Sequence, residues 1–152
     1  MAIFDLMPGD VALGRRGDVL RTLLGTCVSV ILTDARRTLG VMCHIVHVGQ
    51  PNAANRDNTA YGSVAMAEMT RRLHGAGFLP RSCVAYVYGG GNMFPKLYTH
   101  HHVGTHNAEW VLNYLVHHRI AVLRQDLGGV GYRKLSWTVG PGEPVVENLP
   151  SA

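Results

Sequence analysis

The sequence predicts an α+β domain: a layered α/β sandwich in which two main helices pack on a mixed, largely antiparallel sheet. Short apolar and β-branched runs, bounded by turn residues, gather toward both ends of the chain, as strands do. Two stretches carry apolar residues at helical spacing and flank a strand in the middle of the chain. This order does not fit a repeated βαβ pattern. With 152 residues, we expect one domain over 1–152.

The first part of the chain reads as a run of strands. Val19–Leu24 and Val28–Leu32 are apolar and β-branched, and 25–27 interrupts them with Gly-Thr-Cys. Asp34–Thr38 is a polar turn, and Leu39–Val48 is a third apolar run. Strands joined by such short connections usually pair with their neighbours in the chain. We therefore expect a meander of three antiparallel strands.

Helices and further strands follow. The stretch Tyr61–His74 places Ala65, Met66, Met69 and Leu73 on one helical face, and a second helix is expected over Asn107–His118. Residues 49–60 and 89–104 are rich in turn residues and read as long loops. The remaining expected strands are Cys83–Tyr88, Arg119–Asp126, Arg133–Thr138 and Pro144–Glu147.

Composition and charge exclude several classes of protein. The net charge is +4, but Lys and Arg are dispersed and no aromatic residues interleave with them, so we expect no nucleic-acid partner. The longest apolar runs span about five residues, whereas a membrane helix needs about 20. The N-terminus lacks the basic and apolar regions of a signal peptide. We expect a cytoplasmic protein without membrane insertion and with reduced cysteines.

Cys27 and His44 form a candidate nucleophile and base. Cys27 follows Gly25 and Thr26 at the break between two strands, where a bend can expose a thiol and backbone N–H groups. A thiol nucleophile needs a neighbouring base. Counted outward from a turn near Arg36, a hairpin with one bulge brings Cys27 nearly opposite His44. The alternative is an ordinary buried cysteine beside a histidine of the core.

The other cysteines and the histidines suggest competing interpretations. Cys43 precedes His44 on a strand, so it faces the opposite layer and is expected to be inert. Cys83 opens an apolar strand and is expected in the core. The segment His100–His102 lies near His106, which suggests a loop metal site, although the spacing matches no closed zinc pattern. We expect no metal ion.

Several motifs together resemble the CheD family of chemoreceptor glutamine deamidases. The similar segments span most of the chain and keep the order that they have in the family. They are Leu24–Val30 with the following His44, then Tyr88–Phe94, Val103–Ala108, Asp126–Gly129 and Gly131–Lys134. Many members have Ser where this chain has Thr26, and many have a stretch ending in Leu-Pro where this chain has Ile45–Gly49.

The resemblance implies a fold similar to the catalytic domain of the cytotoxic necrotizing factors, and a site in which Cys27 is the nucleophile and His44 the base. A threonine upstream of the cysteine is the third member; Thr22 matches it best, and an offset of one residue would place Arg21 there. Backbone N–H groups near Gly25, Thr26 and Cys27 would meet the oxyanion. No cofactor is implied.

The resemblance also implies a substrate. The family converts glutamine side chains to glutamate on the cytoplasmic helices of methyl-accepting chemotaxis receptors, through a cysteine thioester. Because a glutamate methyl ester would give the same thioester, receptor methylesterase activity is a further hypothesis. The alternative to an enzyme is a non-enzymatic chemotaxis adaptor that binds a CheC-like phosphatase.

Overall fold

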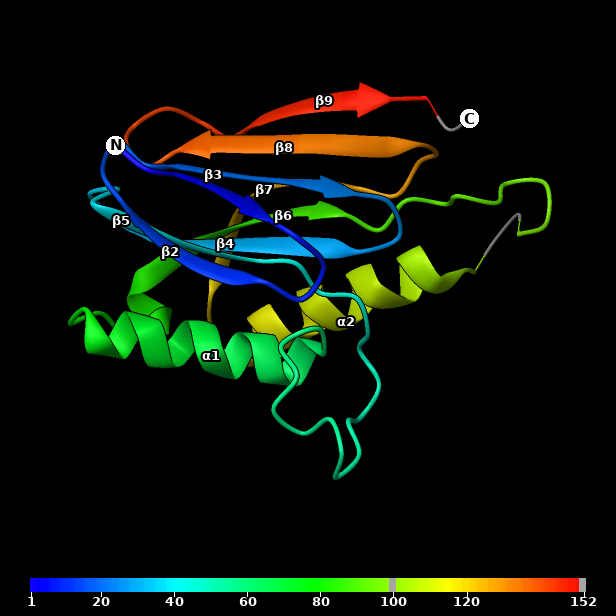
Figure 1. Ribbon diagram of the computed structural model, residues 1–152, viewed down its shortest axis with the longest axis horizontal. Helices are drawn as coiled ribbons and strands as arrows, with labels where there is room; N and C mark the ends of the chain where they lie inside the picture. Colours follow the sequence, from blue (N-terminus) through cyan, green and yellow to red (C-terminus); the bar gives the residue numbers. More distant parts are fainter. Residues whose placement is uncertain (99–100, 151–152) are drawn as a thin grey trace.

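The computed structural model describes residues 1–98 and 101–150 and shows three stacked layers (Figure 1). Two β-sheets form two of the layers, and the two α-helices lie together against the outer face of one sheet. The fold is therefore α+β, as predicted. The strands form two sheets rather than one, and this division positions the candidate site.

The outer sheet has four strands in the order β1-β3-β8-β9. They are β1 (Ile3–Leu6), β3 (Val19–Leu24), β8 (Tyr132–Thr138) and β9 (Val145–Leu149). β1 runs parallel to β3, and the other two pairs are antiparallel.

The central sheet has five strands in the order β2-β5-β4-β6-β7. They are β2 (Val11–Arg15), β5 (Leu39–Cys43), β4 (Val28–Asp34), β6 (Cys83–Gly89) and β7 (Ala121–Leu127). Only the β6–β7 pair of this sheet is parallel. Every residue of β4 and β5 is buried, because helices cover one face of the central sheet and the outer sheet covers the other.

The helices are α1 (Gly62–Gly75) and α2 (Val103–His117), with a short 3-10 turn, η1 (Pro80–Ser82). The stripe of apolar residues predicted for α1 is buried against the central sheet, which confirms that helix. In the described part of the chain, neither helix has the length and hydropathy needed to cross a membrane.

Two apolar cores hold the layers together. The core between helices and central sheet includes Val41, Met69 and Leu115, and the core between the sheets includes Leu20, Ile31 and Trp137. Strand residues alternate between these cores, since neighbouring side chains on a strand point to opposite faces. Cys43 belongs to the helix-side core, as predicted, and so does Cys83.

Part of the predicted strand order is wrong. β4 and β5 are antiparallel neighbours, as expected, but β3 lies in the other sheet and pairs with β1 and β8. The expected three-strand meander is therefore a two-strand hairpin preceded by a strand of the opposite layer. The sequence prediction also missed β1 and β2, and α2 begins at Val103 rather than Asn107.

Candidate active site

A hydrogen bond across the two sheets joins Thr22 to His44. Thr22 Oγ1 lies 2.8 Å from the carbonyl oxygen of Leu6 and 2.7 Å from His44 Nδ1. A carbonyl only accepts, so the single hydroxyl hydrogen goes to Leu6 and the oxygen must accept from His44. Nδ1 therefore carries the ring proton of neutral His44, and Nε2 keeps a lone pair. Thr22, and not Arg21, is the neighbour of the imidazole.

Cys27 lies on the same face of the central sheet as His44. Val28 and Ile45 exchange both backbone hydrogen bonds, and this register places Cys27 across from Val46 and His44 across from Ser29. The two candidate residues are thus diagonal neighbours, for which Cα atoms lie about 7–8 Å apart, within reach of a long side chain.

The predicted bulge is absent from this hairpin. The rung at Val28 and Ile45 keeps the register of the pairing between Ile31 and Met42. Cys27 and His44 are therefore offset by two residues instead of nearly opposite. Because side chains alternate with period two, an offset of two still leaves both on one face.

Residues 25–27, here termed the cysteine turn, carry the chain from the outer sheet to the central sheet. Its carbonyls are all bound: Gly91 N–H donates to Gly25, Gly90 N–H to Cys27, and a side chain to Thr26. Within the described residues, the N–H groups of Thr26 and Cys27 bind no backbone or side-chain acceptor. The turn therefore offers two unpaired donors on the segment that carries the thiol.

The closest backbone approach to the cysteine turn occurs at Gly89 and not at Gly25. A Cβ added at Gly25 would meet Tyr132 and Met93 at ordinary contact distances of 3.4 and 3.5 Å. A Cβ added at Gly89 would lie 2.1 Å from the carbonyl oxygen of Cys27, and Gly89 has a φ of +117°. The glycine that the cysteine turn needs thus belongs to the neighbouring strand.

Burial disfavours charge on both candidate residues. It raises the pKa of the partly buried Cys27 thiol, and a hydrogen bond with the Thr26 side chain opposes the shift. It lowers the pKa of His44, which is 2% exposed, against the opposing effect of the Asp10 carboxylate. The resting pair therefore consists of a neutral thiol and a neutral imidazole.

The other two cysteines are poor nucleophiles. Burial raises the pKa of Cys43 to about 12 and that of Cys83 to about 11. Both side chains pack in the core between the helices and the central sheet. Their thiolates are scarce at neutral pH, and Cys27 is the one cysteine of the three that is only partly buried.

The suggested loop metal site falls partly outside the described residues, because His100 lies there. His101 and His106 are described, and their rings lie 6.1 Å apart. Among the described residues, no group of three or more His, Cys, Asp or Glu side chains is placed to hold a metal ion.

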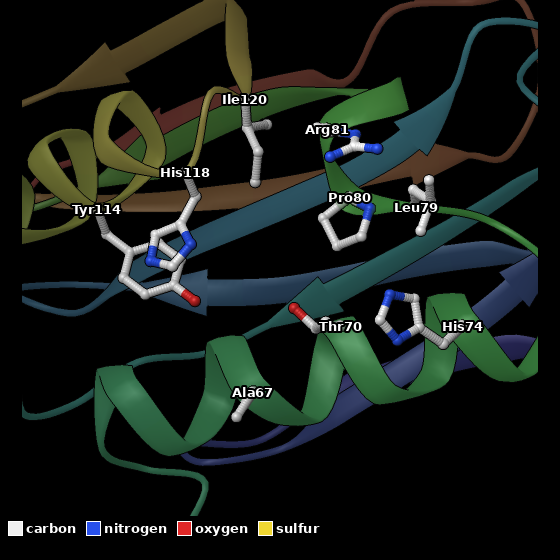
Figure 2. A pocket seen from close by; sticks show the side chains of 9 residues that line it. All are labelled: Ala67, Thr70, His74, Leu79, Pro80, Arg81, Tyr114, His118 and Ile120. Atoms are coloured by element: carbon white, nitrogen blue, oxygen red, sulfur yellow. The ribbon is translucent and has the colours of Figure 1, made fainter.

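Several cavities lie in or beside the helical layer. One of about 520 Å³ is lined from both helices and the η1 region, with His74, Arg81 and His118 around it (Figure 2). None of the three candidate catalytic residues lines it. A smaller cavity of about 310 Å³ is lined by Val46, Tyr61 and Asn107, so it adjoins the segment opposite Cys27.

Two contributors to the site were not predicted from the residues. Asn107, from α2, is the side chain that donates to Thr26, at 3.1 Å. The sequence pattern predicts a helix that begins at Asn107, and nothing local indicates a partner 81 residues away. Asp10 was missed because β2, which it precedes, was missed. The backbone N–H of His44 donates to the carbonyl of Asp10, so the segment before β2 is held next to His44.

Comparison with known proteins identifies the family. The family model described as CheD chemotactic sensory transduction matches residues 47–148. The chain belongs to the CheD family.

Curated relatives extend the similarity beyond the range of the family model. A probable chemoreceptor glutamine deamidase CheD of Pseudomonas savastanoi is 32% identical over 95% of this chain and 84% of its own length. The CheD 2 protein of Albidiferax ferrireducens is 32% identical, with 91% and 82% covered. The probable chemoreceptor glutamine deamidase CheD of Stenotrophomonas maltophilia is 35% identical, with 88% and 66% covered. The match to the family model begins after His44. The longer alignments with the curated relatives are therefore the ones that can include the candidate site.

Proposed function

We propose that this CheD protein is a protein-glutamine deamidase that converts glutamine to glutamate on the cytoplasmic helices of chemoreceptors. The names of the relatives support the reaction and the substrate class. The observation that carries the proposal is the bond from His44 Nδ1 to Thr22, which leaves Nε2 unprotonated on the face that also holds Cys27. The substrate places the reaction in the cytoplasm.

The first half of the reaction forms a thioester. His44 Nε2 takes the proton of the Cys27 thiol, and the sulfur attacks the side-chain carbonyl carbon of a glutamine. Because the resting pair is neutral, the proton moves as the carbon–sulfur bond forms. The imidazolium then returns the proton to the amide nitrogen, the carbon–nitrogen bond breaks, and ammonia leaves.

The cysteine turn is suited to stabilise the oxyanion of this step. The unpaired N–H groups of Thr26 and Cys27 belong to the turn that carries the sulfur, and the bound carbonyls of the turn keep them oriented. Preorganised donors of this kind contribute about 3–4 kcal/mol each to the transition state. Thr26 thereby acts through its backbone N–H, and Gly25 contributes the carbonyl that Gly91 binds to hold the turn.

The second half of the reaction releases glutamate. His44 Nε2 takes a proton from water, the hydroxide attacks the thioester carbon, and the carbon–sulfur bond breaks. The proton then passes from the imidazolium to the sulfur, which restores the neutral pair. A glutamate methyl ester would enter the same cycle with methanol as the leaving group, so methylesterase activity belongs to the proposal.

Mass spectrometry of a receptor cytoplasmic domain tests the function. The full chain is incubated with the domain, and glutamine peptides are compared before and after for conversion of amide to acid. We expect conversion at particular glutamines with the wild type and none with Cys27→Ala. Cys83→Ala is the matched control, because it removes a thiol of the core and should retain conversion.

The possible outcomes separate the alternatives. Full conversion by Cys27→Ala would reject the assigned nucleophile. No conversion by a folded wild type would reject the deamidase. In that case, retained binding to a CheC-like phosphatase would favour the adaptor. Methanol release from a methylated receptor domain, measured in parallel, decides the esterase hypothesis.

A further inference from the structure

The cysteine turn is bound on its carbonyl side by two different kinds of donor. Gly91 N–H and Gly90 N–H donate to Gly25 and Cys27, each at 2.9 Å. Thr26, between them, accepts from Nδ2 of Asn107 at 3.1 Å. One side chain thus completes the set of bonds that the backbone of the neighbouring loop begins.

Asn107 occupies the place of a missing rung in the β4–β5 hairpin. Val28 and Ile45 form a hydrogen-bonded pair, so the next such pair of an antiparallel ladder would join Thr26 to His47. Instead, the N–H of His47 donates to Ala60, and the strand turns away from the cysteine turn. Asn107 donates to the Thr26 carbonyl that this rung would have used.

The same amide group also reaches the strand that carries the base. Asn107 Nδ2 lies 3.4 Å from the carbonyl oxygen of Val46, two residues beyond His44. Both amide hydrogens are therefore engaged, one on each side of the gap between the separating segments. Asn107 is 2% exposed, so water does not compete readily for these bonds.

Close packing of the first turn of α2 sets the distance between Asn107 and the cysteine turn. A Cβ added at Gly104 would lie 2.5 Å from the carbonyl oxygens of Gly90 and Gly91. The helix therefore rests directly on the backbone of the loop that binds the cysteine turn. Asn107, three residues later, lies on the same face of the helix, so its side chain points toward the cysteine turn.

We propose that Asn107 is a positioning residue, whose carboxamide holds the cysteine turn and the His44 strand at the separation that lets the imidazole take the thiol proton. The role rests on the proposed function, because it presumes that Cys27 and His44 react as a pair. Asn107 acts through them, since both of its donors are already bound to the protein.

Alkylation of Cys27 by iodoacetamide tests this role without a receptor substrate. Labelling rates are measured at pH 7.5 for four proteins: wild type, His44→Ala, Asn107→Ala and the double variant. In the protein that keeps Asn107, we expect His44→Ala to slow labelling of Cys27 at least about tenfold. In the Asn107→Ala background we expect less than about a twofold effect, because residues that act as a unit are not additive.

Cys43 and Cys83 report unfolding within the same experiment. Both are buried, so a folded molecule takes one label and an unfolded one takes three. The mass of the intact protein separates these populations, and the rate is taken from the singly labelled one. Asn113→Ala is the matched control, an exposed asparagine of the same helix, and should leave the His44 effect unchanged.

Asn107→Asp distinguishes loss of the donors from loss of volume. The variant keeps the shape but replaces the amide donors with a carboxylate that faces two carbonyl oxygens. We expect the same loss of the His44 effect as in Asn107→Ala. An equal His44 effect in the wild-type and Asn107→Ala backgrounds would overturn the proposal, as would full retention in Asn107→Asp.

Deamidation kinetics give a second, independent readout. We expect Asn107→Ala to lower kcat by about 10- to 100-fold with KM unchanged, as for a small displacement of reacting groups. A purely structural role would lower the melting temperature and leave kcat of the folded protein unchanged. If the wild type converts no glutamine, the proposed function fails, while the labelling experiment still decides the role of Asn107.

Discussion

At the scale of single residues, the Thr22 hydroxyl sets the chemistry of His44. Its hydrogen is held by the Leu6 carbonyl, so its oxygen can only accept from the imidazole. In the proposed mechanism the nitrogen that acts as the base is therefore Nε2, on the ring edge opposite Thr22. Arg21, the neighbour in sequence, points away and pairs with Asp5 on the exposed face of the outer sheet.

Replacing Thr22 tests this control of the imidazole. Thr22→Val keeps the shape but leaves His44 Nδ1 without an acceptor, so we expect kcat to fall by about 100-fold or more. Thr22→Ser retains the hydroxyl and should keep most of the activity. Rates of ammonia release compare the two variants, and equal rates for valine and wild type would contradict the assigned role.

The pH dependence of activity follows from the buried state of His44. Burial lowers the pKa of His44 below its ordinary value of 6.5, and the base must be unprotonated. The acid limb of kcat/KM should therefore have its midpoint below pH 6.5. Burial disfavours protonated His44 in the folded state only. The contribution of His44 to stability is therefore present above pH 6.5 and is lost as pH falls through the lowered pKa.

Asp10 provides a direct check on that limb. Its carboxylate raises the pKa of His44, so Asp10→Asn should move the acid limb to still lower pH. The neutral amide oxygen can still accept from Met7, as Asp10 Oδ2 does now. Asp57→Asn, in the loop before α1, is the matched control and should not shift the limb. A shift to higher pH in Asp10→Asn would reject the electrostatic role.

At the scale of elements, the site depends on three chain segments that pass very close to one another. β6 ends at Gly89 against the cysteine turn, and Gly104 in the first turn of α2 packs against the loop after β6. The α2 helix therefore starts before the residues whose spacing predicted it. Its first turn contributes close packing, which leaves no apolar periodicity in the sequence.

Gly89→Ala tests this close approach. The new methyl group would lie 2.1 Å from the Cys27 carbonyl, at a φ of +117° that alanine rarely adopts. We expect a loss of about 3 kcal/mol in the free energy of unfolding, measured in urea, together with loss of activity. Gly75→Ala, at the end of α1 with no atom near its added Cβ, should not lower stability. A loss equal to that of Gly75→Ala would refute the steric argument.

At the scale of the whole molecule, the candidate active site forms because the chain changes sheets at the cysteine turn. Thr22 belongs to the outer sheet, while Cys27 and His44 belong to the central sheet and the segment that extends it. The spacing between the sheets therefore controls the Thr22–His44 bond. Trp137, 1% exposed, fills that space over Gly40, where a Cβ would lie 2.4 Å from the indole ring.

Trp137→Ala should therefore destabilise the whole fold. Truncating a buried tryptophan lowers the free energy of unfolding by about 3–5 kcal/mol. Loss of the indole N–H would also leave the Gly142 carbonyl without its donor. Urea unfolding followed by circular dichroism measures the loss. Val116→Ala, on an exposed position of α2, is expected to change the free energy of unfolding by less than about 0.5 kcal/mol. Similar values for both variants would show that the indole does not hold the sheets together.

Local patterns predicted both helices and most of the strands, and they placed Cys27 together with His44. Apolar periodicity identified α1, and the turn between β4 and β5 correctly implied that those strands pair. That short connection fixes the register, and alternation along a strand then places Cys27 and His44 on one face and Cys43 on the other. Two errors came from the same local view: the assignment of β3 to the meander, and the added bulge.

The partners of the site came from contacts between distant segments. Thr22 meets His44 from the opposite sheet, Asn107 meets Thr26 across 81 residues, and Gly89 meets Cys27 from another strand. Periodicity records which face of an element is apolar, but not which element that face will meet. Short-range pairing could therefore be inferred from the order of the residues, whereas the packing of layers became evident only once the chain was folded.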